Sequence, residues 1–336
     1  MDSLTHIALG ACIGEAFFER GFGKKAMWWG ALAQSIPDID FISSFWLNTS
    51  EALLAHRAFT HSILFAILII PLFSLIAERI HRPHNISYRK WYLFFFIEVF
   101  VHLFTDSFNN YGIGWLEPFS HLRFSFNLIY IADPFFSLVP VISLIMLIVL
   151  NRYNLKRKKY WKIGLLIPII YLTFCTINKY YVDNYIEKTL LQQHLSTKRF
   201  FTTPAPFQNL LWYIVVASDS GFYIGYYSIL DKKDNMKFNF YPSNVSFLNQ
   251  VSDHENLQRL KRFSQGYFTI EKWRDTLVFN DLRFGQITGW NSYPSKFVFH
   301  YYLQHPNDNK LIIQKGRFSS WNIYKFNSLI DRIKGI

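Results

Sequence analysis

Histidine and aspartate side chains near the start of the chain have spacings that suit a metal site. His102 and Asp106 stand four residues apart, so on a helix they share one face and can offer an imidazole nitrogen and a carboxylate oxygen to the same ion. His6 is a further candidate ligand. Imidazole and carboxylate without thiolate suit Zn²⁺, with Mn²⁺ or Fe²⁺ as alternatives. Such an ion lowers the pKa of bound water and polarises a phosphoryl or carbonyl oxygen, which is the chemistry of hydrolysis.

The motif His56-Arg-Ala-Phe-Thr-His-Ser62 supplies two more histidines. They are five residues apart, about 140° around a helix, so they need not share a ligand position, whereas Arg57 and His61 share a face. We therefore expect His61 to be the firmer ligand and His56 to be a second ligand or a catalytic group. Arg57 is expected to clamp an anionic oxygen.

The motif Ser35-Ile-Pro-Asp-Ile-Asp40 places two carboxylates directly after a proline. Pro37 interrupts the apolar segment around it, and a broken helix at membrane depth is tolerated where it lines a cavity. We expect one of Asp38 and Asp40 to be a metal ligand. With Asp40 as the ligand, Asp38 is expected to act as general base or to orient the ligands.

These polar residues lie in or beside apolar segments. The 336-residue chain is 51% hydrophobic and only 17% charged, below the roughly 25% of an average soluble domain. Three stretches are long enough, or nearly so, to span a bilayer, and three weaker ones accompany them: Ile63–Ile80, Ile129–Leu150 and Ile163–Asn178, then Leu4–Phe18, Ala26–Leu47 and Trp91–Phe104. The start, Met1-Asp2-Ser3, lacks the basic region of a signal peptide. Ionisable residues inside such segments are functional candidates because they are costly unless paired, hydrated or metal-bound.

Basic residues concentrate in alternate loops between these segments. Thirteen of them follow the segments Leu4–Phe18 and Ile63–Ile80 or precede the segment Ile163–Asn178. They are Arg20, Lys24, Lys25, Arg79, Arg82, Arg89, Lys90, Arg152, Lys156, Arg157, Lys158, Lys159 and Lys162. Because positive residues mark the cytoplasmic side, the sequence predicts an outside N-terminus, six segments and an outside C-terminal region. The first two segments are either spanning or interfacial. Every candidate ligand then maps to the outer side, and the net charge of +12 does not indicate a nucleic-acid partner.

The pattern changes after about residue 180. Short aromatic and β-branched runs are separated by turn residues, which predicts strands: Leu211–Ala217, Gly221–Ile229, Lys237–Tyr241, Thr276–Asn280 and Lys296–Leu303. Leu248–Phe263 has helical spacing instead. We predict an α-helical polytopic membrane domain over residues 1–179. A mainly β (α+β) extramembrane, extracytoplasmic domain is predicted over residues 180–336.

The order of these motifs resembles that of a known family. Asp2-Ser-Leu-Thr-His-Ile-Ala-Leu-Gly10, Pro37-Asp-Ile-Asp40 and the two histidine motifs are similar to the YdjM-like family of bacterial membrane-bound metal-dependent hydrolases. Thr203-Pro-Ala-Pro-Phe-Gln-Asn-Leu-Leu-Trp212 and Asp281-Leu-Arg-Phe-Gly285 resemble its longer members, which have an extra C-terminal domain. The resemblance implies a bacterial inner (cell) membrane protein with several spans.

The order of the ligands also resembles a second, more distant group. His, Asp, His and then His-x-x-x-Asp is similar to the first part of the zinc-dependent phospholipase C and single-strand nuclease superfamily, which cleaves phosphodiesters. That similarity implies His6, Asp40, His61, His102 and Asp106 as ligands. A second His-x-x-x-Glu/Asp pair is missing downstream, so one or two ions are expected instead of three.

The sequence therefore predicts a membrane-bound metal-dependent hydrolase of zinc type. Its expected substrate is a phosphoester, a membrane lipid or a lipid-linked molecule at the outer membrane face. One alternative is an ion-coupled transporter that uses the same residues as a permeation path, although the sequence shows no inverted repeat. The other is a non-enzymatic membrane scaffold in which these residues only support the fold.

Overall fold

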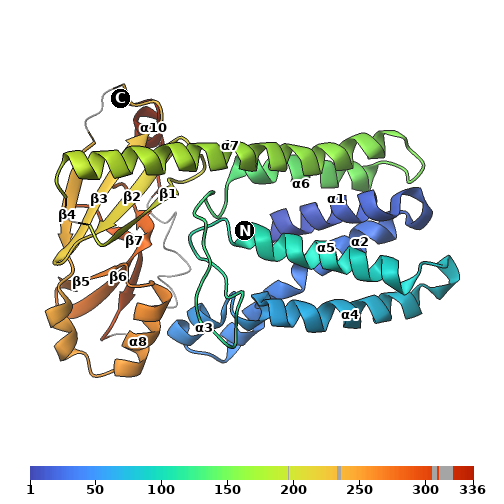
Figure 1. The fold of residues 1–336 in the computed structure, drawn as a ribbon, viewed down its shortest axis with the longest axis horizontal. Helices are drawn as coiled ribbons and strands as arrows, with labels where there is room; N and C mark the ends of the chain where they lie inside the picture. The colour runs from blue at the N-terminus through green and yellow to red at the C-terminus, as the bar shows by residue number, and fades with distance from the viewer. Residues whose placement is uncertain (196, 233–235, 305–308, 310–320) are drawn as a thin grey trace. The chain divides into compact units, whose positions relative to one another are not determined.

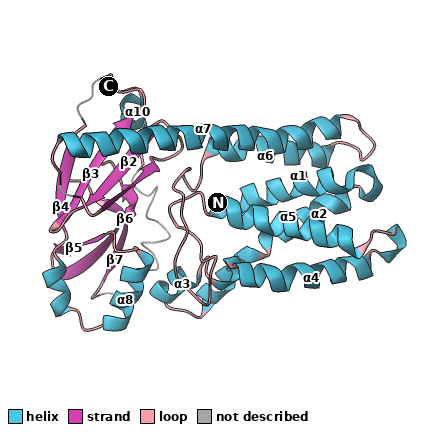
Figure 2. Cartoon of the chain, viewed as in Figure 1, coloured by secondary structure: helices cyan, strands magenta, loops and turns pink. Residues whose placement is uncertain are grey.

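Two compact units make up the chain (Figure 1). The computed structural model describes residues 1–195, 197–232, 236–304, 309 and 321–336. The first unit combines Met1–Phe45 with Ala55–Cys175, and the second combines Trp46–Leu54 with Thr176–Ile336. The first is built from helices, and both sheets that the structure describes lie in the second (Figure 2). The predicted order, a helical N-terminal region followed by a sheet-rich C-terminal region, is confirmed.

The helices of the first unit follow the apolar segments, and several of them begin at side-chain caps. They are α1 (Ser3–Phe22), α2 (Lys24–Ser35), α4 (Ile63–Ile80), α5 (Tyr88–Asp106), α6 (Pro134–Val149) and α7 (Lys156–Gln192), which continues into the second unit. Asp2, Ser62 and Asp133 accept backbone amide hydrogens at the starts of α1, α4 and α6. By length and composition, α4 and α7 can each cross a membrane, and Ser3–Phe18 and Pro134–Val149 are shorter apolar helices.

The predicted segment Ala26–Leu47 is not one continuous helix. α2 ends at Ser35, and a 3₁₀ helix, η1 (Pro37–Phe45), follows it. Pro37 has no amide hydrogen to continue the α-helical ladder, which explains the break. The 12 residues of α2 rise about 18 Å, well short of the roughly 30 Å of a hydrocarbon core.

Glycines bring α1 and α2 into close contact. A Cβ atom on Gly30 would collide with the backbone carbonyl of Gly10, so each position tolerates little besides glycine. His6 precedes Gly10 by one turn and Gln34 follows Gly30 by one turn. The close packing therefore sets the side chains of His6 and Gln34 beside each other, with His6 Nδ1 3.3 Å from Gln34 Oε1.

The candidate residues gather at one end of these helices. His6 lies in the first turn of α1, Asp38 just beyond α2, His61 just before α4 and Asp106 at the end of α5. Because α1 and α2 run in opposite directions, as do α4 and α5, these four positions come to the same end (Figure 1). The α1–α2, α4–α5 and α6–α7 turns, whose sequences are basic, lie at the opposite end.

Two antiparallel sheets form the second unit. The first has the order β1 (Arg199–Pro204), β2 (Leu211–Ala217), β3 (Gly221–Ser228) and β4 (Phe238–Pro242), and the second has the order β5 (Phe268–Trp273), β6 (Thr276–Gln286) and β7 (Phe297–Tyr302). In register, Val215 pairs with Phe201 on one side and Ile224 on the other. β2 is buried along its whole length because Ile214 packs against α7 and Val215 packs against the second sheet.

The strand predictions hold at five positions. β2, β3, β4, β6 and β7 overlap the five predicted runs, whereas β1 and β5 were not predicted. The predicted helix Leu248–Phe263 is divided into a 3₁₀ helix, η4 (Val245–Gln250), and α8 (His254–Phe263). Asp253 accepts the amide hydrogen of Asn256 and so caps α8, which fixes the break. The described residues also contain α3 (Thr49–Ala55), the 3₁₀ helix η3 (Arg82–His84) and α10 (Ile323–Ile333).

Candidate metal centre

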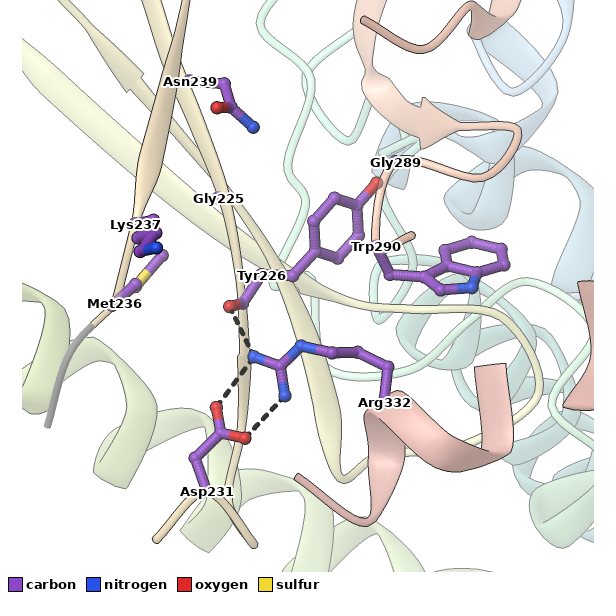
Figure 3. Close-up of a pocket in the computed structure, with 9 residues that line it drawn as sticks. All are labelled: Gly225, Tyr226, Asp231, Met236, Lys237, Asn239, Gly289, Trp290 and Arg332. Carbon is purple, nitrogen blue, oxygen red and sulfur yellow. Dashed lines mark hydrogen bonds and ion pairs between the residues drawn. The ribbon is translucent and has the colours of Figure 1, made fainter. Parts of the chain in front are cut away.

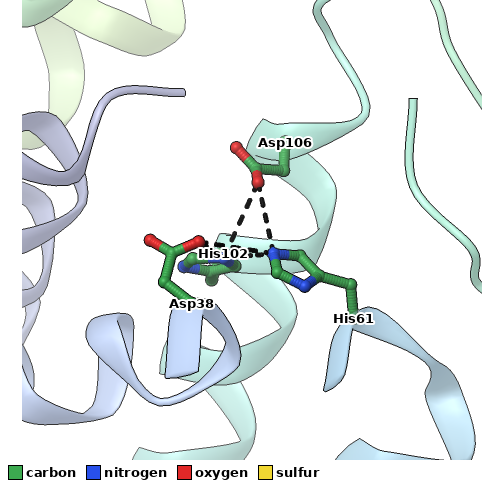
Figure 4. A group of neighbouring side chains, drawn as sticks. All are labelled: Asp38, His61, His102 and Asp106. Carbon is green, nitrogen blue, oxygen red and sulfur yellow. Dashed lines mark hydrogen bonds and ion pairs between the residues drawn. The ribbon is translucent and has the colours of Figure 1, made fainter. Parts of the chain in front are cut away.

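Four side chains meet at the end of the helices and form what we call the His/Asp centre (Figure 4). Asp38, His61, His102 and Asp106 each offer one ligand atom, and these atoms lie within 4.8 Å of one another. Asp38 belongs to η1, His61 to the short 3₁₀ helix η2 (Phe59–His61), and the other two to the last turns of α5. The side chain of Asp38 is 22% exposed, whereas those of the other three are fully buried. Asp38 is thus the member of the centre that solvent reaches.

The separations within the centre fit one tetrahedrally bound ion. His61 Nε2 lies 3.2 Å from His102 Nε2, 3.5 Å from Asp38 Oδ1 and 3.4 Å from Asp106 Oδ2. His102 Nε2 lies 3.7 Å and 3.8 Å from the same two carboxylate oxygens. Around Zn²⁺, bond lengths of about 2.0–2.1 Å place neighbouring ligand atoms about 3.3 Å apart. The residues therefore fit an ion of this size.

Hydrogen bonds to the other ring nitrogens leave both Nε2 atoms free. His102 Nδ1 lies 2.6 Å from the backbone oxygen of Gln34, which can only accept, so Nδ1 carries the hydrogen. His61 Nδ1 lies 3.2 Å from Thr60 Oγ1 and 3.4 Å from Asp40 Oδ2, and the Thr60 hydroxyl itself donates to Asp40. His61 Nδ1 is therefore a donor as well. Two nitrogen lone pairs and two carboxylate oxygens then converge, and this arrangement calls for a cation.

The charge distribution around His61 favours a positive charge. Burial by itself would lower the pKa of His61, but hydrogen bonds with Asp106, Asp38 and Asp40 raise it to about 10. Burial would also raise the pKa of Asp38, yet the hydrogen bond with His61 and the other nearby histidines hold it below its ordinary value. The His/Asp centre thus stabilises a cation, either a proton on His61 or a metal ion.

Asp40 lies outside the centre and orients it, which differs from its expected role as ligand. Its Oδ1 is 3.1 Å from His56 Nδ1, and its Oδ2 accepts from the Arg57 amide at 2.6 Å and from the Thr60 hydroxyl at 3.2 Å. Burial opposes ionisation, but the hydrogen bonds with His56 and His61 hold the pKa of Asp40 below its ordinary value. Both oxygens of the Asp40 carboxylate are occupied by these hydrogen bonds. Asp38 therefore lies in the centre, where Asp40 was expected, and Asp40 lies beside it.

Arg57 is held inside the protein and does not present a free guanidinium. Its Nε lies 3.0 Å from Asp106 Oδ2, its Nη1 donates to Asn109 and its Nη2 donates to the Met1 carbonyl. Its side chain is 3% exposed. Its φ of 59° also shows that residues 56–61 are not an α-helix, so the argument from a shared helical face with His61 was wrong. The geometry assigns Arg57 to fixing Asp106 and not to clamping an anion.

His6 flanks the centre on the other side of Asp106. Its Nε2 lies 3.0 Å from Asp106 Oδ1, and its ring stacks on that of His102 with centroids 3.9 Å apart. The Met1 amine contacts the same oxygen. One oxygen of Asp106 therefore faces the His/Asp centre and the other faces His6.

Gln34 is the functional residue that the sequence analysis missed. Its backbone oxygen fixes His102, its side-chain oxygen faces His6, and its amide nitrogen donates to the backbone oxygen of Glu98 at 2.9 Å. The sequence feature that could have indicated Gln34 is its position as a polar residue in an apolar stretch, one turn before Asp38. His56, by contrast, lies at the edge, with its side chain 41% exposed and its ring 6.3 Å from that of His61.

The second unit holds a separate polar hollow of about 290 Å³ (Figure 3). It lies over β3 and β4 and includes Tyr226, Trp290 and Arg332. Arg332 makes a two-pronged ion pair with Asp231 and also donates to the Tyr226 carbonyl. Lys237 is the further charged side chain of the lining, so among the described residues the hollow holds no cluster of histidines and carboxylates comparable to the His/Asp centre.

The fold and the site define a class, a protein with a domain of apolar helices and a buried His/Asp centre at one end of them. The chain belongs to the YdjM inner membrane protein family, which matches residues 1–182. That range contains every residue of the centre. Membership agrees with the apolar helices and establishes the protein as an inner membrane protein.

Two relatives show how far the similarity extends. Inner membrane protein YbcI of Escherichia coli (strain K12) is 32% identical over 123 residues, which cover 36% of this chain and 69% of YbcI. Uncharacterized protein YfhP of Bacillus subtilis (strain 168) is 34% identical over 149 residues, which cover 40% of this chain and 42% of YfhP. No solved structure matches the chain.

Proposed function

We propose that the protein is a membrane-embedded metal-dependent hydrolase of zinc type. The observation that carries the proposal is the convergence of His61 Nε2 and His102 Nε2, 3.2 Å apart, with both Nδ1 atoms facing acceptors. The carboxylates of Asp38 and Asp106 complete the group. Structural histidines seldom turn two lone pairs toward two carboxylates, whereas metal ligands are routinely oriented in this way.

His61, His102 and Asp106 are the proposed ligands, a two-histidine, one-carboxylate set of the kind found in catalytic zinc sites. An ion held there would polarise a phosphoryl oxygen and lower the pKa of a bound water. Asp38 is the proposed acceptor of a proton from the attacking water, and its partly exposed side chain supports this role. The proposed number of ions is one or two, because His6 faces the second oxygen of Asp106.

The His56–Asp40 pair is the proposed proton donor to the leaving group. Asp40 Oδ1 accepts from His56 Nδ1 at 3.1 Å, which orients the ring and leaves Nε2 for proton transfer. The exposed position of His56 suits a group that meets substrate at the mouth of the site. The same Asp40 carboxylate faces His61, so one residue would orient both the ligand and the proton donor.

The proposed topology has several spans, an outside N-terminus and an extracytoplasmic C-terminal region. Its support is the segregation of the ends of the helices: the centre lies at one end, and the basic turns lie at the other (Figure 1). The site would then open at the outer face, where a lipid phosphoester or a lipid-linked phosphate is the natural substrate.

Metal analysis of detergent-purified protein tests the proposal. We expect the wild type to retain a stoichiometric divalent ion, to gain thermal stability with added Zn²⁺, and to hydrolyse a chromogenic phosphodiester or phospholipid vesicles. Asp106→Asn should lose all three, whereas Asp219→Asn, in the β2–β3 turn, is the matched control and should lose none. A metal-free wild type that Zn²⁺ does not stabilise would refute the metal site. Equal turnover in Asp106→Asn and wild type would refute its catalytic role.

An ion-coupled carrier is the second candidate function, and Glu98 is the observation that favours it. Glu98 is fully buried in α5, one turn before His102, and its carboxyl group makes no ion pair within the described residues. A carrier would use such a group as a binding site for an ion or a proton inside the membrane. In proteoliposomes, Glu98→Gln should abolish zinc or proton flux if the protein is a carrier, but should leave turnover intact if it is a hydrolase.

A further inference from the structure

The 3₁₀ helix η1 has one acidic face and one apolar face. Asp38 and Asp40 turn inward, toward the centre and toward His56. Its apolar side chains are exposed on the remaining surface: Ile39 and Phe45, which share a face at three residues per turn, are 52% and 77% exposed, and Phe41, one turn after Asp38, is 58% exposed. An apolar face of this kind on a short helix, next to buried carboxylates, needs a partner that removes it from water.

Exposed apolar side chains also occur on the neighbouring elements η2 and α4. Phe59 of η2 is 44% exposed and its ring packs on Phe65 of α4. α4 is long and apolar enough to cross a membrane, yet only 22% of its apolar window is buried inside the protein, and Ile67 is 61% exposed. η2 leads directly into α4, and Thr60 of η2 hydrogen-bonds to Asp40 of η1, so the exposed apolar side chains of η1 lie near the start of this apolar helix.

The serine hydroxyls of η1 are hydrogen-bonded within the segment. Ser43 Oγ donates to the Asp40 carbonyl at 2.7 Å, and Ser44 Oγ donates to the Phe41 carbonyl at 2.6 Å. Because internal hydrogen bonding lowers the cost of leaving bulk water, these bonds suit a segment that lies in the interfacial layer of a bilayer. At nine residues, η1 is also too short to cross the hydrocarbon core.

We propose that η1 is an interfacial anchor, which lies along the membrane surface with Ile39, Phe41 and Phe45 in the outermost acyl layer. Its occupant is the bilayer itself. Consequently, Asp38 sits at the level of the lipid headgroups, and the depth of the His/Asp centre is set by these three side chains. The inference concerns depth alone and holds whether the protein is a hydrolase or a carrier.

Depth-dependent fluorescence quenching tests the anchor on the full chain. Cys12 and Cys175, both buried, are first replaced by alanine. Phe41→Cys and Phe45→Cys are then labelled with bimane and reconstituted in phosphatidylethanolamine and phosphatidylglycerol vesicles. The vesicles contain nitroxide lipids that are labelled either near the headgroup or near the chain end. Leu72→Cys, an exposed position in the middle of α4, is the deep control.

We expect both η1 labels to lose more fluorescence to the headgroup-level nitroxide than to the chain-end nitroxide, and Leu72→Cys to show the reverse. Strong quenching by aqueous iodide with no response to either lipid would show that the face lies in water, and would overturn the anchor. Greater quenching from the chain end would show a deeply inserted segment, and protection from all three quenchers would show a protein cover. Either result would also overturn it. Two label sites guard against a local effect of one substitution, and elution volume and circular dichroism check the fold.

Discussion

The Nε2 atoms of His61 and His102 lie 3.2 Å apart, although the residues are 41 positions apart in sequence and belong to different elements. Neither ring is free to turn away, because each Nδ1 faces an acceptor outside the centre. The hydrogen bonds of the two Nδ1 atoms therefore orient both imidazole rings toward the same point. Substitutions of the residues that make these hydrogen bonds can test the metal hypothesis while every proposed ligand is kept.

Asp40→Asn should weaken metal binding even though Asp40 is outside the centre. The amide keeps the shape but loses one acceptor for the donors of His56, Arg57 and Thr60. We expect zinc affinity to fall about 10–100-fold, the usual cost of removing an orienting partner. Competition with a fluorescent zinc chelator measures this. Asp231→Asn, whose carboxylate pairs with Arg332 in the second unit, is the control for general loss of an ion pair, and its affinity should not change.

Metal affinity should rise with pH. The pKa of His61 is raised from its ordinary 6.5 to about 10, so without metal its Nε2 carries a proton through the neutral range. A metal ion needs that lone pair and must displace one proton, so affinity should rise about tenfold per pH unit and level off as pH approaches 10. Calorimetric titrations in buffers of different ionisation enthalpy count the proton. Affinity that stays constant from about pH 6 to pH 9 would contradict this assignment of His61.

Asp38→Asn should separate catalysis from metal binding. Asp38 is the only member of the centre with an exposed side chain, and we assign it to proton transfer, not to holding the ion. The asparagine cannot accept the proton, so turnover should fall about 10²–10⁴-fold while metal content stays near that of the wild type. Metal analysis and phosphodiester turnover on the same sample measure both. Loss of the ion in this variant would instead make Asp38 a fourth ligand.

Local patterns predicted the parts of the site that one element determines. His102 and Asp106 share a face because four residues make about one turn, and the apolar run Ile63–Ile80 coincides with α4. The roles of Asp38 and Asp40 could not be assigned in this way. The two side chains stand in a 3₁₀ helix whose orientation is set by contacts with η2, and those contacts involve residues far along the sequence.

The same limit explains the other differences. Arg57 has a left-handed backbone conformation, which the sequence does not predict because glycine and asparagine are the residues that usually adopt it. Gln34 acts on His102 through its backbone oxygen, which every residue type has. β5 mixes Glu271 and Lys272 with aromatic residues, so its run lacks a continuous strand pattern, and it becomes a strand by pairing with β6, which begins only three residues after β5 ends.

Glu98→Gln should leave the protein at least as stable as the wild type. The carboxyl is fully buried, and among the described residues it makes no ion pair, so an ionised group there would lack a counter-charge. The amide has the same shape and carries no charge, so the thermal midpoint of the detergent-solubilised protein should be unchanged or higher. Glu98→Ala should lower it, because removing buried atoms opens a cavity beside Gly30. A lower midpoint for Glu98→Gln than for the wild type would mean that Glu98 is ionised and has a cation partner.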